Sequence, residues 1–206
     1  MRPHRTLHPS SGQLDAFLRA TPDVQCDHVD IRRHALAITQ GHPDPIERTA
    51  RLFEWVRDQI PHTFDVGAEI VTCSAIEVLG ARTGICHAKA HLLAALLRAS
   101  GIPAGFVYQR LRWDETSDGW VLHGLNGVHL GPLDRWILLD ARGNTRGIDA
   151  QFDTEAERLA FPDDAGLGGR IYPTVFSDPA PTVIAALRCA RDTNHLRTLL
   201  PDSLER

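Results

Sequence analysis

Cys86 and His123 are the side chains of this 206-residue chain whose chemistry suits nucleophilic attack on acyl groups. A thiolate attacks a carbonyl carbon, and a nearby imidazole holds the proton and returns it to a leaving amine. Strong helix formers follow Cys86, so we expect this residue to begin a helix, where unpaired N–H groups lower the pKa of a thiol. We expect Gly84 to form a sharp turn that leaves room for a substrate, and the N–H of Cys86 to form part of an oxyanion hole.

Asp140 is the candidate that would orient the base. His123 lies in one predicted strand and Asp140 ends the next, and neighbouring antiparallel strands bring such positions side by side. His129 follows at an even separation along the same strand, so both histidines share a face and His129 stays open as an alternative base. The simpler interpretations are a buried, inert cysteine and an aspartate that only ends a strand.

His87 and His91 are one helical turn apart and follow Cys86, a spacing that is also found in zinc sites. A metalloprotease helix carries a glutamate after its first histidine, whereas this chain has Ala88. The sequence offers no evident third ligand. We therefore predict no metal and no cofactor, and keep a metalloprotein as the weaker alternative.

The elements that must position these residues change from helices to strands along the chain. Capping residues and apolar spacing predict helices at 44–60, 74–80, 86–100, 181–190 and 193–200. Pro61 stops the first of these helices, and Ser74 and Gly80 are the expected caps of the second. Short β-branched and aromatic segments predict strands at 106–113, 121–130 and 136–140, separated by turns at 114–120 and 131–135. This order predicts an α+β fold in which a central buried helix packs on an antiparallel sheet, with extra helices at both ends.

Length and composition favour a single domain over residues 1–206, with a catalytic core at about 44–152. The formal charge is 22 − 26 = −4 and the basic residues are scattered, so we expect no nucleic-acid partner. No apolar run resembles a signal sequence or a membrane span, and the cysteines are widely separated. We expect a cytoplasmic protein with free thiols and no membrane partner. The composition does not predict an oligomeric state.

The segment Ser74–Gly105 resembles the nucleophile motif of the bacterial transglutaminase-like superfamily. The segments around His123 and from Trp136 to Asp140 resemble its histidine and aspartate strands, which favours His123 over His129. The resemblance is strong from Ser74 to about residue 144. It implies a papain-like fold and a Cys-His-Asp triad that acts on amides of peptides, proteins or small molecules, by hydrolysis, deamidation or acyl transfer.

Two positions depart from that pattern. Leu125 stands where many members have an aromatic residue, and Ala141 replaces the usual proline after the aspartate, so both are expected to alter the walls of the cleft. Lys89 and Arg142 are candidates for drawing an acidic substrate to the cleft, although a solvated or salt-bridged position is the simpler interpretation of each. The alternative to an enzyme is a non-catalytic module that keeps the fold and uses the cleft to bind a peptide or partner.

Overall fold

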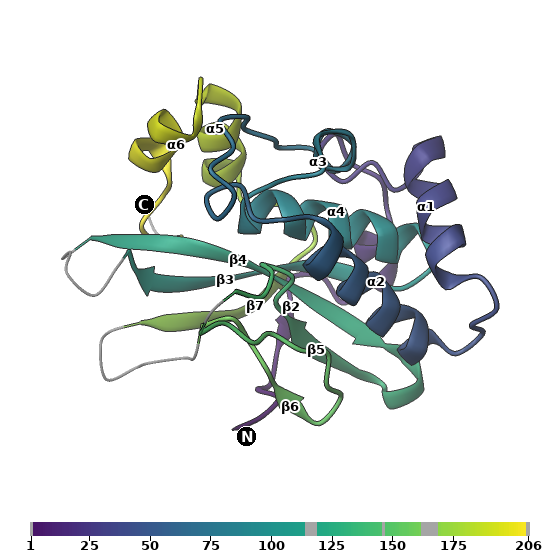
Figure 1. Ribbon diagram of the computed structural model, residues 1–206. Coiled ribbons are helices and arrows are strands. Elements are labelled where there is room, and N and C mark those ends of the chain that lie inside the picture. The colour runs from purple at the N-terminus through teal and green to yellow at the C-terminus, as the bar shows by residue number, and fades with distance from the viewer. Residues whose placement is uncertain (1, 114–118, 146, 162–168, 205–206) are drawn as a thin grey trace.

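The computed structural model describes residues 2–113, 119–145, 147–161 and 169–204. Within these residues, six α-helices lie on one face of a curled five-stranded sheet (Figure 1). The helices are α1 (Val29–Thr39), α2 (Pro45–Gln59), α3 (Ala75–Ala81), α4 (Cys86–Ala99), α5 (Pro181–Cys189) and α6 (Thr193–Leu199). The predicted α+β class is confirmed, and the five predicted helix ranges correspond to α2–α6 to within two residues at each end, whereas α1 had no assigned range in the sequence.

The sheet has the strand order β2-β7-β3-β4-β5. Its strands are β2 (His8–Pro9), β3 (Ala104–Arg112), β4 (Trp120–Leu130), β5 (Arg135–Leu139) and β7 (Arg170–Phe176), and β1 (Arg2–Pro3) pairs separately with β6 (Ala156–Glu157). The predicted meander corresponds to β3, β4 and β5, which pair antiparallel in that order. Most of the turn predicted at 114–120 lies outside the described residues. β7, which pairs with β3, was not predicted, because Pro173 interrupts its strand pattern.

Local capping fixes the ends of the helices that lead to the site. The side chain of Asp44 accepts the N–H of Ile46 at 3.0 Å, with Pro45 as the first residue of α2. Ser74 and Glu77 form a capping box at the start of α3. The prediction that Gly80 ends this helix is wrong. The helix continues to Ala81, and Arg82 adopts the left-handed conformation with φ 57° and donates its N–H to Val78.

Helix α4 lies at the centre of the fold, as its apolar circumference predicted. Every residue from His87 to Arg98 is buried, because helices α1, α2 and α3 pack on one side of α4 and strands β3 and β4 on the other. A second apolar cluster, on the opposite face of the sheet, includes Phe17, Val107 and Val175. Among the described residues no helix has the length and apolarity needed to cross a bilayer.

Candidate active site

Cys86 is the first residue of α4, so its side chain lies where the central helix emerges from the core. The preceding residue, Ile85, has an extended backbone and offers no side-chain cap, which leaves the first N–H groups of the helix without a side-chain acceptor. The residue is half-buried, and its sulfur accepts a hydrogen bond from the backbone N–H of Gly124 in β4. This is an environment in which a thiolate is stabilised.

His123 and Asp140 come from neighbouring strands. The β4–β5 ladder ends with Asn126 paired to Leu139, and both side chains lie just beyond that pair. The Nε2–H group of His123 donates to Oδ2 of Asp140 at 2.9 Å, and both side chains are buried. Because Nε2 is used in this way, Nδ1 is the ring nitrogen left for the hydrogen bond between His123 and Cys86. The structure therefore brings the three predicted residues together.

Backbone N–H groups hold the Asp140 carboxylate in place. Its Oδ2 also accepts the N–H of Ala160 at 3.0 Å, and its Oδ1 accepts the N–H of Arg142 at 3.1 Å. A carboxylate fixed from several sides cannot rotate away from the imidazole, so it holds the ring in one orientation. The sequence analysis did not identify Ala160, which lies 20 residues after Asp140 and carries no recognisable signal.

The three groups shift one another's pKa values. Burial alone would raise the pKa of Cys86, but the charge and hydrogen bond of His123 and the N–H of Gly124 bring it below the ordinary value. Burial alone would lower the pKa of His123, yet the charges of Asp140 and Cys86 raise it above the usual range. Burial opposes the charge on Asp140 as well, and His123 nevertheless keeps the pKa of that carboxyl low. The environment thus favours a thiolate beside an imidazolium.

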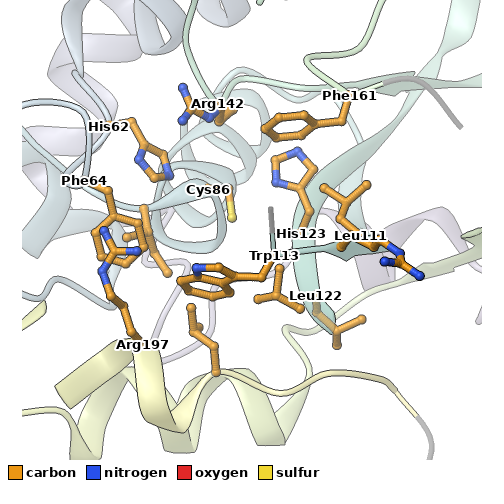
Figure 2. A pocket seen from close by; sticks show the side chains of 14 residues that line it. His62, Phe64, Cys86, Leu111, Trp113, Leu122, His123, Arg142, Phe161 and Arg197 are labelled. Atoms are coloured by element: carbon orange, nitrogen blue, oxygen red, sulfur yellow. The ribbon is translucent and has the colours of Figure 1, made fainter. Parts of the chain in front are cut away.

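A cavity of about 340 Å³ opens beside Cys86 and His123 (Figure 2). It is lined by His62, Phe64, Ile85, Cys86, Leu111, Arg112, Trp113, Val121, Leu122, His123, Arg142, Phe161, Arg197 and Leu200. The sequence analysis missed most of this wall, because its members come from the loop after α2, the end of β3, the segment before β7 and helix α6. A substrate that enters this cavity meets aromatic and aliphatic surface interrupted by guanidinium groups.

His129 is not part of this site. It lies near the other end of β4, where its ring packs on Trp136 and its Nε2 lies 3.4 Å from Oδ1 of Asp134. The shared strand face predicted for the two histidines does not bring both to the thiol, since the site is confined to the end of β4 near residue 123.

Lys89 is neither a surface residue nor a residue of the pocket wall, so both expectations for it are wrong. It is fully buried, and its Nζ donates to the backbone carbonyls of Arg57 and Ile60 at the end of α2. Burial lowers the pKa of Lys89 to about 7. The sequence did not reveal this because α4 is enclosed on all sides, which leaves even its lysine inside.

Leu125 and Gly84 also differ from expectation. Leu125 is buried with Val107 in the cluster on the other face of the sheet and does not line the cavity. A Cβ atom on Gly84 would lie 3.2 Å from Oγ1 of Thr72 and 3.3 Å from Cβ of Ala88, so this glycine permits close packing inside the protein rather than access for a substrate.

Arg142 does line the cavity, and it is salt-bridged as the simpler interpretation predicted. Its guanidinium forms two hydrogen bonds to the Asp65 carboxylate, at 2.6 and 2.8 Å. This pairing joins the loop after α2 to the segment after β5 across the mouth of the site. Asp65 therefore offsets much of the charge that Arg142 would otherwise present to a substrate.

His87 and His91 form backbone contacts inside the core. Nε2 of His87 lies 3.0 Å from the carbonyl of Leu122, and Nδ1 of His91 lies 2.7 Å from that of Cys73. Burial lowers the pKa of His87 to about 3 and that of His91 to about 4. Within the described ranges no three histidine, cysteine or acidic side chains gather as a metal site would require. These contacts give both histidines a structural role.

Residues 32–141, more than half of the chain, match the transglutaminase-like superfamily. The chain belongs to this superfamily. The matched segment contains the thiol, the imidazole and the carboxylate described above, and the α+β fold is of its papain-like type.

One of two similar solved structures supports the fold of this superfamily member. A "putative cysteine protease" from Cytophaga hutchinsonii is 21% identical with a TM-score of 0.53, and the match covers 79% of this chain and 52% of that one. A "putative protease" from Parabacteroides distasonis is 14% identical with a TM-score of 0.41, and the match covers 72% of this chain and 30% of that one. The chain thus spans about half the length of the first structure. No curated protein matches it in sequence.

Proposed function

We propose that this transglutaminase-like protein is a cysteine enzyme that breaks amide bonds through a thioester on Cys86. The observation that carries the proposal is the thiol at the start of α4, hydrogen-bonded to a His123 ring that Asp140 holds at 2.9 Å. The lowered pKa of Cys86 and the cavity beside it support the same role, since a nucleophile must be both ionised and reachable.

The reaction follows from these positions. The Cys86 thiolate attacks the amide carbon, a C–S bond forms, and negative charge moves onto the carbonyl oxygen. The protonated His123 gives its Nδ1 proton to the leaving nitrogen as the C–N bond breaks, which leaves a thioester and a neutral imidazole. Water or an amine then attacks the thioester, His123 takes its proton, and the Cys86 thiolate is released.

The cavity wall suits an amide of a peptide, a protein or a small molecule. Its aromatic members, Phe64, Trp113 and Phe161, provide apolar surface around the sulfur (Figure 2). Such surfaces contribute binding energy and exclude water from the reacting groups.

The proposal is tested with peptide, isopeptide and glutamine-containing substrates, each assayed with and without a labelled primary amine. The native protein is compared with Cys86→Ala and with Cys189→Ala, which removes an exposed thiol on α5 as a matched control. We expect turnover in the native protein and the control only, with a thioester mapped to Cys86. Incorporation of the amine would identify acyl transfer, and its absence hydrolysis. Equal turnover by Cys86→Ala would contradict the proposal.

A further inference from the structure

The proposed reaction places negative charge on a carbonyl oxygen, and the backbone N–H of Cys86 is one donor for it. Acyl-transfer sites commonly surround this oxygen with more than one preorganised donor. The cavity wall contains few side chains that can donate a hydrogen bond there, apart from the triad. They are His62, Trp113 and three arginines, Arg112, Arg142 and Arg197.

His62 differs from the other donors of the wall in being buried with an unpaired ring nitrogen. Its side chain is 6% exposed, and its buried Nδ1 atom has no hydrogen-bond partner among the residues that the structure describes. By contrast, Arg142 is committed to Asp65, and the exposed Arg197 stacks on the Phe64 ring at 3.9 Å. A buried polar atom without a hydrogen bond calls for an explanation, and a catalytic role of the side chain that carries it is one. We propose that His62 is a further catalytic residue, which donates a hydrogen bond from Nε2 to the oxyanion formed during acyl transfer at Cys86.

The loop that carries His62 is tied to the segment that leads into α4. A β-bridge joins His62 to Gly84, two residues before Cys86, and the N–H of Thr63 donates to the Gly84 carbonyl at 3.2 Å. The hydroxyl of Thr83 donates to the carbonyl of Pro61 at 3.0 Å. These bonds on both sides of His62 fix its backbone relative to the nucleophile, as a preorganised donor requires.

The ring lies on the opposite side of the sulfur from His123 (Figure 2). It points into the cavity toward Cys86, and Nε2 is at the end of the ring farthest from the backbone. Because His123 must face the leaving nitrogen, the carbonyl oxygen is directed to the other side of the thiol. That side is where His62 lies.

The protonation state of His62 suits a neutral donor. Burial, together with the positive charges of Arg142 and Lys89, lowers the pKa of His62 to about 2, so the ring carries a single proton at neutral pH. Its Nδ1 lies 3.9 Å from Oδ1 of Asp65, beyond hydrogen-bond distance, and both Asp65 oxygens already accept from Arg142. No hydrogen bond therefore holds the proton on Nδ1, and it is available on Nε2 for the oxyanion.

This inference rests on the proposed function, and one experiment separates the two. Acetylation of Cys86 by p-nitrophenyl acetate builds an oxyanion, whereas alkylation by iodoacetamide displaces iodide at a saturated carbon and builds none. We expect His62→Ala to slow both acetylation and release of the acetyl group by about 100-fold, as loss of one oxyanion donor does elsewhere. Alkylation should keep the native rate and pH profile. His62→Gln, which retains an N–H donor, should recover most of the loss, and His8→Ala on the exposed strand β2 should behave as native.

Three results would overturn the role of His62. Acetylation of His62→Ala at the native rate would show that the ring does not contact the oxyanion. An equal loss of alkylation would indicate structural damage, and an effect confined to acetyl release would indicate that His62 acts on the acceptor instead. Failure of the native protein to form an acetyl thioester at Cys86 would remove the proposed function and this inference together.

Discussion

A cysteine lies at the N-terminus of each of the helices α3 and α4, and the pKa values of the two thiols are shifted in opposite directions. Cys73 lies just before the cap of α3, where burial raises its pKa to about 12, with the carboxylates of Asp23 and Glu77 adding to the effect despite Arg188. Cys86 begins α4, and His123 brings its pKa below the ordinary value in spite of burial. Burial and a helix N-terminus are common to both thiols. They differ in whether a cation outweighs burial: His123 does so at Cys86, whereas Arg188 does not at Cys73, where two carboxylates oppose it.

The backbone N–H groups at the starts of the two helices also differ, because the protein supplies side-chain acceptors for them at α3 and not at α4. At α3 the Glu77 carboxylate accepts the N–H groups of Cys73 and Ser74, and the Ser74 side chain accepts that of Glu77. At α4 the cap residue Ile85 provides no such acceptor. An anion is therefore supplied by the protein at α3, whereas at α4 the thiolate or a substrate oxyanion can take that place.

Removal of His123, the cation beside Cys86, should reduce the difference in reactivity between the two thiols more than any other change. We expect His123→Ala to slow acetylation of Cys86 by p-nitrophenyl acetate about 1000-fold at neutral pH, since the base and the stabilising charge are both lost. The burst of p-nitrophenol measures this rate. His129→Ala, on the same strand, is the matched control and should react as the native protein does. An equal loss in the control would show that strand β4, and not the imidazole, was affected.

Neutralisation of the carboxylate should have the next largest effect. Asp140→Asn preserves the shape of the side chain but removes the charge that raises the pKa of His123, so acetylation should slow about 100-fold. Because a less charged imidazole stabilises the thiolate less, the pKa of Cys86 should rise, and alkylation by iodoacetamide should require a higher pH. An unchanged pH profile of alkylation would show that Asp140 does not contribute to the activation of the thiol.

Loss of the α3 cap should weaken the protection of Cys73. Ser74→Ala removes one half of the capping box, and we expect a loss of about 1 kcal/mol in the free energy of unfolding, measured with urea. Alkylation of Cys73 should then increase about fivefold if it requires opening of this region, while that of Cys86 stays constant. Similar increases at both thiols would indicate a global effect.

The guanidinium at the edge of the cavity should have the smallest effect. Arg197 lines the cavity that contains Cys86, so Arg197→Gln should reduce the rate with iodoacetate about threefold relative to iodoacetamide. Added salt should diminish this preference in the native protein. Arg191→Gln, at an exposed position before α6, should leave the ratio unchanged. Equal ratios in all three proteins would exclude a contribution of this charge.

The sequence predicted those parts of the site that depend on local signals. Strong helix formers after Cys86 predicted α4, and the strand pattern placed His123 beside Asp140. Residues that reach the cavity from distant elements, such as Phe161 and Arg197, have no local signal, because only the tertiary fold brings them there. The burial of Lys89 was hidden for the same reason.

Alkylation of the native protein by iodoacetamide, resolved by peptide and followed against pH, tests the central claim most directly. A lowered pKa keeps a thiol ionised as the pH falls, so Cys86 should react with an inflection well below that of a free thiol, about 8.5. Cys73 should react far more slowly than Cys86 throughout the pH range in which the protein is folded. An inflection at Cys86 like that of a free thiol, or a Cys86 as inert as Cys73, would contradict an activated nucleophile at the start of α4.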